Sequence, residues 1–356
     1  MNPISVGWDI GGAHVKVAVV ENQEIIAVYQ EPCPLWQGLD KLELAVKTLL
    51  EKISNQPQKH AITMTGELVD LFANRHDGVQ QIIQMMTQLL GDSEIEIFCG
   101  KLGLLPVSEI NETYFDAIAS ANWLASASFA AKQFEEGLFV DIGSTTTDIL
   151  LYKNGDVAAQ GFSDYERLIS QELIYTGIVR TAVMSVTQTV LDNEKQVGIM
   201  AEHFATMADV YRLTGELSEN HDQTPTADGE EKTIEASARR LSRMLGDDFK
   251  IEELARWQAV AHDIRRQQLQ RIQKNCALQM SRLGKKPTLI GAGIGRFLIQ
   301  EIAQNLECRY VDFSTLFKKT SHHHNLTFNP ADCAPAVAMA FLITDCLNYQ
   351  GYSPKF

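Results

Sequence analysis

The chain has 356 residues, which suggests two domains, and it is 45% hydrophobic and 21% charged, as ordinary globular proteins are. Its formal net charge of −14 argues against nucleic acid or an anionic membrane as a partner, because both favour basic surfaces. The sequence shows no apolar stretch of membrane-spanning length and no metal-binding spacing among its six cysteines, and we expect no leader peptide. These features predict a cytoplasmic protein with reduced thiols, in which an anionic ligand is held locally by amides, Lys, Arg or a metal.

The first predicted element is a β-hairpin. An apolar run over 6–10 ends in Asp9-Ile10-Gly11-Gly12, and a second apolar run follows over 17–20. A carboxylate at the end of a buried strand, beside a glycine turn with free N–H groups, suits a magnesium-bound phosphate. We therefore expect Asp9 to hold a metal and Gly11 and Gly12 to bind phosphate. Lys16 either reaches this phosphate or is a solvated strand residue.

The rest of the first half alternates strands with helices. Strands are predicted over 25–29, 61–65 and 95–98, with helices over 39–53 and 79–90 between them. This order is typical of a ribonuclease-H-like half. Thr65-Gly66-Glu67 ends its strand on the expected cleft side, so Glu67 is a candidate catalytic carboxylate, although a helix N-cap explains the same residues nearly as well. We expect 111–131 to form a buried helix that leads to the second half.

The hairpin motif recurs about 130 residues later. An apolar run from 138 ends in Asp141-Ile142-Gly143, and a further apolar run begins at Ile149. Five consecutive small or hydroxyl residues between them are candidates for phosphate binding, namely Gly143, Ser144, Thr145, Thr146 and Thr147. Because two copies of the motif occur, we expect two similar half-domains that face one cleft, with Asp141 as the second metal ligand.

A segment dense in charges follows at 164–180. It contains Asp164, Arg167, Glu172 and Arg180 around Tyr175-Thr176-Gly177. A salt-bridged surface helix would explain the charges, whereas a cleft wall would also explain the Tyr-Thr-Gly sequence. In the second interpretation Arg180 clamps a phosphate, because its guanidinium fork matches phosphate oxygens. Asp148 and Asp164 are then further candidates for proton transfer.

The region of about 190–285 is predicted to be a helical insertion. A helix over 201–213 carries Glu202, Asp209 and Arg212, which we expect to be surface charges, and the polar stretch 215–233 is expected to be an exposed loop. A long helical region follows over 251–283. Further on, three consecutive histidines at 322–324 favour a loop over a metal site, because adjacent side chains diverge.

A glycine turn at 291–295 offers a competing interpretation. The predicted order of elements here, strand, glycine turn, helix and strand, imitates a dinucleotide-binding unit. Asp312 follows Gly295 by 17 residues, close to where that unit has an acidic residue. However, Arg296 stands where the third glycine of that pattern belongs, so an anion or an adenine is the better ligand for this turn. The candidate residues of the turn are Gly291, Gly293 and Gly295. We divide the chain into a first lobe of 1–130, joined by a C-terminal helix at 331–350, and a second lobe of 131–330.

The two hairpins and the late glycine turn, in this order, resemble the actin, sugar kinase and Hsp70 ATPase superfamily. Several motifs are similar to its hydantoinase/oxoprolinase-related branch, and within it to proteins of tetrahydromethanopterin-linked one-carbon transfer, which include archaeal enzymes of methanofuran biosynthesis. The resemblance spans roughly residues 4–345, and His14 stands where members often carry Asn. The motifs are Met64-Thr65-Gly66-Glu67-Leu68, Ala121-Asn122-Trp123, Asp141-Ile142-Gly143-Ser144-Thr145-Thr146-Thr147-Asp148, Glu172-Leu173-Ile174-Tyr175-Thr176-Gly177 and Phe204-Ala205-Thr206-Met207-Ala208-Asp209-Val210.

The resemblance implies a Mg²⁺-dependent transferase, in which a primary amine displaces pyrophosphate from the activated carbon of an aminomethylfuran diphosphate. Asp9 and Asp141 would hold the metal, and the two glycine turns with Lys16 and Arg180 would cradle the diphosphate. Glu67, Asp148 or Asp164 would accept the amine proton. The partners would be these two small molecules, and a homo-oligomer is compatible with the sequence. Two alternatives stay open: a small-molecule kinase or amide hydrolase that uses ATP, with adenine at the Gly291 turn, and a non-catalytic nucleotide-binding regulator.

Overall fold

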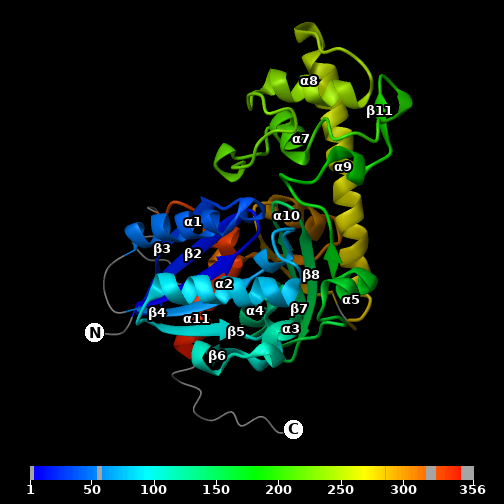
Figure 1. The fold of residues 1–356 in the computed structure, drawn as a ribbon. Coiled ribbons are helices and arrows are strands. Elements are labelled where there is room, and N and C mark those ends of the chain that lie inside the picture. The colour runs from blue at the N-terminus through cyan, green and yellow to red at the C-terminus, as the bar shows by residue number, and fades with distance from the viewer. Residues whose placement is uncertain (1–3, 54–57, 285, 318–325, 346–356) are drawn as a thin grey trace.

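Two α/β lobes and a helical insertion make up the chain (Figure 1). The computed structural model describes residues 4–53, 58–284, 286–317 and 326–345. Each lobe is built on its own mixed sheet, so the predicted two-lobed α/β fold is confirmed.

The first lobe contains a six-stranded sheet in the order β3-β2-β1-β4-β5-β6. Strand β1 pairs antiparallel with β2 and parallel with β4. Helices α1 and α2 cover one face of this sheet, because their apolar residues at helical spacing, such as Leu42, Val46 and Ile82, are buried there. The elements are β1 (Ile4–Ile10), β2 (His14–Glu21), β3 (Glu24–Pro32), α1 (Leu39–Lys52), β4 (Gln58–Met64), α2 (Arg75–Leu90), β5 (Glu94–Phe98) and β6 (Leu104–Pro106).

The second lobe repeats the start of the first. Strands β7 and β8 form the second predicted hairpin, and the sheet order is β10-β8-β7-β13-β14, with β9 paired to β8. Helices α9 and α10 pack on the outer face of this sheet. The elements are β7 (Glu136–Ile142), β8 (Thr147–Lys153), β9 (Asp156–Val157), α5 (Asp164–Ser170), β10 (Leu173–Ile174), β13 (Thr288–Ala292), α10 (Arg296–Asn305) and β14 (Arg309–Asp312).

Two helices, α4 (Asn122–Ala131) and α11 (Ala334–Asp345), form a shared apolar layer between the two sheets. The approach of α11 to β1 is very close. A Cβ added at Gly7 would lie 2.0 Å from the carbonyl oxygen of Ala336, so only glycine fits there. The last helix of the chain therefore packs on the first lobe and begins beside the ends of β1 and β7.

The insertion projects away from the two lobes, and the long helix α9 connects it to them (Figure 1). Two expectations about its charges are wrong. Asp209 and Arg212 are buried, because Asp209 accepts a hydrogen bond from Arg240 at 2.8 Å and Arg212 contacts Asp222 at 2.6 Å. The stretch 215–233 is likewise not uniformly exposed, since Asp222 is buried by this contact, whereas Glu202 is exposed as expected. The elements are α6 (Val183–Val186), β11 (Thr189–Asp192), β12 (Lys195–Gly198), α7 (Met207–Thr214), α8 (Ile234–Met244) and α9 (Leu254–Met280).

The helix predicted over 111–131 is interrupted. The structure has a short helix α3 (Phe115–Ile118), then a break, then α4. Ser120 lies in the break with φ of 52°, a left-handed conformation that a helix interior does not allow. The break points the Ser120 hydroxyl at the carboxylate of Glu67, to which it donates at 2.7 Å.

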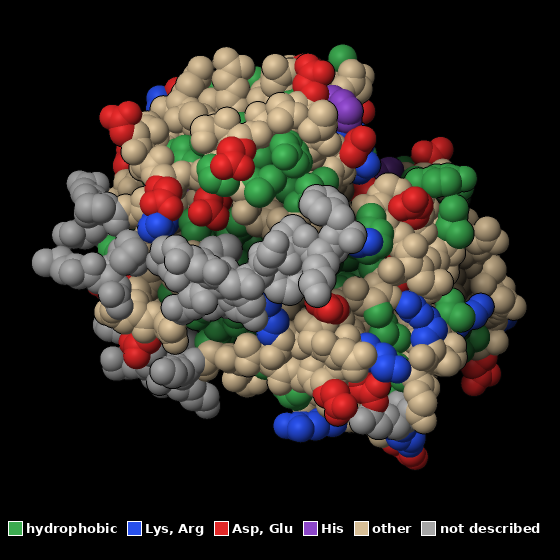
Figure 2. Space-filling view, turned by 90° about the horizontal axis from the view of Figure 1, so that it is seen from below, with side chains coloured by type: hydrophobic (Ala, Val, Ile, Leu, Met, Phe, Trp, Pro, Cys, Tyr) green, Lys and Arg blue, Asp and Glu red, His purple; other side chains and the backbone are tan. Residues whose placement is uncertain are grey.

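Among the described residues no helix is long and apolar enough to cross a membrane, and the five described cysteines are free thiols. Lys and Arg side chains are interspersed with Asp and Glu on the face shown in Figure 2. The histidines at 322–324, Cys346 and the end of the helix predicted to reach 350 lie outside the described residues.

Candidate functional site

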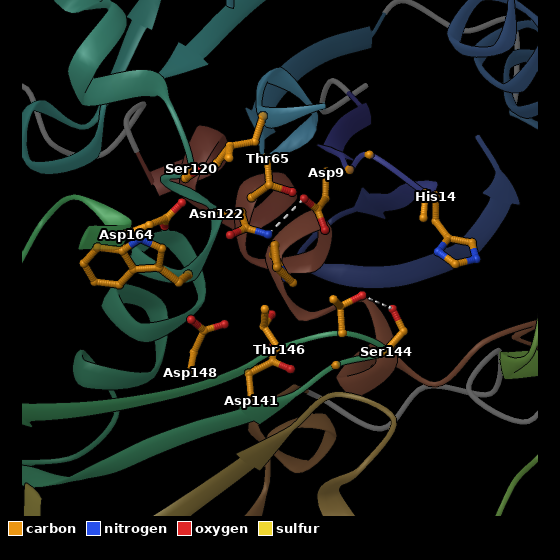
Figure 3. A pocket seen from close by; sticks show the side chains of 18 of the residues that line it. Asp9, His14, Thr65, Ser120, Asn122, Asp141, Ser144, Thr146, Asp148 and Asp164 are labelled. Atoms are coloured by element: carbon orange, nitrogen blue, oxygen red, sulfur yellow. Dashed lines mark hydrogen bonds between the residues drawn. The ribbon is translucent and has the colours of Figure 1, made fainter. Parts of the chain in front are cut away.

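A cavity of about 310 Å³ lies between the lobes, and both glycine turns line it (Figure 3). Asp9 from β1 and Asp141 from β7 lie on opposite walls in this view. Pro335, at the start of α11, also contributes to the wall. The two motif copies therefore face one cleft, as the sequence predicted. The predicted site residues that line the cavity are Asp9, Gly11, Gly12, Lys16, Asp141, Gly143, Ser144, Thr145, Thr146, Asp148, Asp164 and Arg180.

The first turn leaves two backbone donors free. The N–H of Gly11 closes the turn by donating to the carbonyl of His14 at 3.0 Å. The N–H groups of Gly12 and Ala13 have no hydrogen-bond partner in the described part of the chain, although both residues line the cavity. Such adjacent amides form an anion-binding nest, so the first turn can cradle a phosphate.

The second turn has the same geometry. The N–H of Gly143 donates to the carbonyl of Thr146 at 2.9 Å, and the N–H groups of Ser144 and Thr145 have no partner among the described residues. The following segment supports this turn from behind. The backbone N–H groups of residues 178–180 donate to the carbonyls of Gly143 and Ser144, and a Cβ added at Gly177 would lie 2.5 Å from Thr145 N. The Tyr-Thr-Gly sequence therefore fixes the turn, and Thr147 does not line the cavity because its hydroxyl donates to the carbonyl of Thr176.

Each turn carries one aspartate that lines the cavity, and the two have different neighbours: Asp9 is buried and Asp141 is partly buried. Asp9 lies opposite Lys16 in the β1–β2 register, with 4.0 Å between Lys16 Nζ and the carboxylate, and Asn122 donates to it at 3.2 Å. Burial raises the pKa of Asp9, whereas Lys16 acts to lower it. Asp141 lies opposite a second acid, Asp148, and burial together with this acid raises the pKa of Asp141 to about 7. Lys16 opposes this rise, but the two neighbouring carboxylates outweigh it, and such a pair of acids favours binding of a cation beside Asp141.

Asp148 is held by Arg167, whose guanidinium group also lies 4.0 Å from the centre of the Trp123 ring. Burial raises the pKa of Asp148, and Arg167 opposes this rise. Arg167 and Trp123 both line the cavity. The charged segment 164–180 is thus a wall of the cleft, and the alternative of an ordinary surface helix is wrong for its cavity-lining members.

A polar chain crosses from one lobe to the other beside this wall. Arg75 of α2 donates to Asp164 of α5 at 2.6 Å and to the hydroxyl of Ser120 at 2.9 Å. Glu67 accepts from Ser120, and burial raises the pKa of Glu67. Glu67 itself does not line the cavity, so its predicted catalytic role lacks direct access to a ligand there. Arg75 and Ser120 were not predicted as site residues, because no local sequence pattern marks them.

Arg180 lies at the opposite side, near the first lobe. Its guanidinium carbon is 5.6 Å from the centre of the Trp36 ring, and it donates to the hydroxyl of Thr145 at 3.4 Å. No carboxylate within the described residues forms an ion pair with it. An unpaired guanidinium beside free amides suits an anionic ligand.

The late glycine turn does not line this cavity. The N–H of Gly293 donates to Ala331 at 2.7 Å and that of Gly295 donates to Ile142 at 2.9 Å, while Gly291 packs on Tyr310. Gly293 has φ of 79°, and a Cβ there would lie 2.3 Å from the carboxylate of Asp141. These glycines let the chain pass close behind the second turn, and their predicted role at an adenine stays a prediction.

The arrangement fits a magnesium ion that is shared with a phosphate. The described residues contain no group of three or more His, Cys, Asp or Glu side chains that could hold a metal by themselves. Mg²⁺ in phosphate sites commonly uses one or two carboxylates and completes its shell with phosphate oxygens and water. Asp9 and Asp141, which the cavity brings together, match that requirement.

Comparisons with known proteins agree with this architecture. A "(4-{4-[2-(gamma-L-glutamylamino)ethyl]phenoxymethyl}furan-2-yl)methanamine synthase" of Methanocaldococcus jannaschii is 32% identical over 251 residues, which cover 70% of this chain and 73% of that protein. A protein of the same name from Methanococcus vannielii is 30% identical over 124 residues, which cover 35% of this chain and 55% of that one. The name describes a phenoxymethyl group on C4 of the furan ring, so an ether oxygen is bound to that methylene carbon, whereas the amine nitrogen is on the methylene at C2. The expected primary-amine acceptor is therefore wrong for the product that this name describes.

A solved structure shows the same fold. Nucleotide-free acetone carboxylase aligns with a TM-score of 0.55 at 8% identity, over 94% of this chain and 70% of that one. A ROK-family glucokinase from Streptomyces griseus, in complex with glucose and AMPPNP, aligns with a TM-score of 0.46 at 14% identity, over 95% of this chain and 98% of that one. The family model for hydantoinase/oxoprolinase matches residues 58–319. This chain belongs to the hydantoinase/oxoprolinase family.

Proposed function

We propose that the chain is an enzyme of methanofuran or methanofuran-analogue biosynthesis that transfers an (aminomethyl)furan-3-ylmethyl group to a phenol. The phenol oxygen attacks the methylene carbon of an aminomethylfuran diphosphate. The bond from that carbon to the diphosphate oxygen breaks, pyrophosphate leaves with the electron pair, and a carboxylate accepts the phenolic proton. The named product of the Methanocaldococcus jannaschii relative, an aryl ether of a furan-3-ylmethyl group, supports this choice of acceptor.

The observation that carries the proposal is the pair of facing glycine turns with unpartnered amides. Gly12 and Ala13 offer two N–H groups from one lobe, and Ser144 and Thr145 offer two from the other. Donors that are already in place stabilise charge that develops on a leaving group, because they need no reorganisation during the reaction. A diphosphate has enough oxygens to contact both turns at once.

Asp9 and Asp141 would hold Mg²⁺, and Lys16 would contact a phosphate oxygen next to Asp9. When bound, the metal would neutralise negative charge on the departing pyrophosphate. Arg180 would contribute a second fixed positive charge from the second lobe. These residues would orient the diphosphate and offset its negative charge.

Asp148 is the proton acceptor that we favour among the three expected carboxylates. It lines the cavity, and burial raises its pKa, which makes it a better base near neutral pH. Asp164 also lines the cavity, and each of the two carboxylates is paired with an arginine, Asp164 with Arg75 and Asp148 with Arg167. Asp148 is preferred because burial raises its pKa even with Arg167 beside it. Glu67 lies behind Ser120 and outside the cavity wall.

The test is a coupling assay without ATP. The purified chain is incubated with Mg²⁺, 5-(aminomethyl)furan-3-ylmethyl diphosphate and a 4-(2-acylaminoethyl)phenol, and the products are followed by mass and by pyrophosphate release. We expect the aryl ether and pyrophosphate in equal amounts, with neither formed when the phenol is replaced by its methyl ether. Formation of ADP that depends on a small substrate would instead support a kinase or amide hydrolase. Nucleotide binding without turnover would support a regulator.

A further inference from the structure

The cavity has two chemically different sides. In Figure 3, Asp148 and Asp164 lie on one side, His14 and Ser144 lie on the other, and Asp9 and Asp141 lie between them. The arginines beside these carboxylates, Arg167 and Arg75, are already paired with Asp148 and Asp164, so they do not offer a free positive charge to a polyphosphate. The free amides, Arg180 and Lys16 belong to the glycine-turn side, so the cavity can orient a ligand that is anionic at one end only.

His14 is the feature of the glycine-turn side that the assigned roles leave unexplained. The residue is only 7% exposed and lines the cavity, and its Nε2 has no hydrogen-bond partner among the described residues. Two other histidines that are shielded from solvent have partners: His60 accepts from Trp8 at 3.0 Å, and His221 contacts Asp332 at 3.1 Å. A buried polar group without a partner costs about 1–3 kcal/mol, so the partner of His14 is expected to be a ligand.

The charges around His14 select the kind of ligand. Burial, with Lys16 and Arg180 acting in the same direction, lowers the pKa of His14 to about 3. The imidazole is therefore neutral at neutral pH and carries one proton that it can donate to a ligand. A cation would be repelled by the same two side chains, whereas a phosphate oxygen would be attracted by all three groups.

We propose that the His14 imidazole donates a hydrogen bond to a phosphate oxygen of the bound diphosphate, and that the diphosphate therefore lies on the His14 side of the cavity. This assignment rests on the proposed function and deepens it. It gives His14 the role of a leaving-group donor beside the free amides of Gly12 and Ala13. The organic end of the substrate then extends toward Trp123, Asp148 and Asp164.

The experiment measures binding of inorganic pyrophosphate with Mg²⁺ to the full chain by calorimetry, without any reaction. His14→Leu removes the donor, and we expect it to weaken binding roughly tenfold or more, the effect of losing one hydrogen bond to a charged group. His14→Gln keeps an N–H donor and should bind within about threefold of the wild type. His262→Leu, at an exposed position on α9 outside the cavity, should leave affinity unchanged. Equal affinity of His14→Leu and the wild type would overturn the inference.

A second measurement uses the wild-type chain alone. In wild-type chain with ¹⁵N-labelled histidine, Mg²⁺ and pyrophosphate should shift one imidazole resonance, and an unchanged set of imidazole resonances would overturn the inference. The two proposals fail separately. Loss of pyrophosphate affinity in His14→Leu without any ether formation by the wild type would keep the inference and refute the function. Ether formation together with unaltered affinity in His14→Leu would refute the inference and keep the function.

Discussion

Lys16 and Asp148 occupy equivalent positions in the two lobes. Lys16 faces Asp9 across the β1–β2 hairpin, and Asp148 faces Asp141 across the β7–β8 hairpin. Both hairpins end in a turn closed by the same backbone hydrogen bond, from Gly11 and from Gly143. The two copies thus share their geometry and differ in charge, so one lobe offers a cation to the phosphate and the other offers an additional carboxylate.

The first prediction concerns Asp141. Asp141→Asn keeps the size of the side chain and removes the charge expected to bind Mg²⁺, so pyrophosphate release should fall by roughly a hundredfold or more. The matched control is Asp156→Asn, at an exposed position in β9, which should retain wild-type activity. Steady-state rates at several Mg²⁺ concentrations provide the measurement. An Asp141→Asn enzyme with wild-type rates would show that this carboxylate does not hold the metal.

The second prediction concerns the support behind the second turn. In Gly177→Ala the new Cβ would lie 2.5 Å from the carbonyl carbon of Ser144, so the turn must shift. We expect a stability loss of about 1–3 kcal/mol in urea unfolding, together with weaker pyrophosphate binding. Gly198→Ala is the control, because nothing lies within 4 Å of its added Cβ. The free energy of unfolding of this control should change by about 0.5 kcal/mol or less. An equal loss of stability in the two variants would show that Gly177 does not support the second turn.

The third prediction concerns the buried ion pairs of the insertion. Arg240 is fully buried and binds Asp209 and Asp228. Arg240→Met leaves the buried Asp209 carboxylate with only the more distant guanidinium of Arg212, at 3.8 Å, which should destabilise the chain by about 3–5 kcal/mol. Arg243→Met removes a half-exposed arginine whose contact with Asp228 measures 3.3 Å, and it should cost about 1 kcal/mol or less. Similar unfolding midpoints for both variants would contradict the buried network.

The fourth prediction concerns pH and the buried pair of Trp8 and His60. Burial lowers the pKa of His60 to about 4 from its ordinary value of 6.5, so the unfolded chain binds this proton first as pH falls. The stability that neutral His60 contributes is present above pH 6.5 and is lost progressively toward pH 4. Between pH 7 and pH 5 the wild type should lose about 2 kcal/mol relative to His60→Gln. Urea unfolding of both chains at these two pH values measures the difference, and a constant difference would contradict the lowered pKa.

The sequence predicted the parts of the site that depend on local patterns. Both hairpins follow from an apolar run that ends in Asp-x-Gly, because strand and turn preferences act over a few residues. The Arg75–Asp164 contact joins residues 89 positions apart, and no local pattern indicates it. The burial of Asp209 and Arg212 was missed for the same reason, since their partners lie on α8 and in the loop before it. The left-handed Ser120 depends on its contact with Glu67, which only the packed fold provides.

The most direct test of the central claim is a crystal structure of the chain with Mg²⁺ and pyrophosphate. We expect one metal ion between the carboxylates of Asp9 and Asp141, with pyrophosphate oxygens in contact with the amides of both glycine turns. Pyrophosphate bound to a single turn, with Asp9 and Asp141 both remote from the metal, would contradict the account.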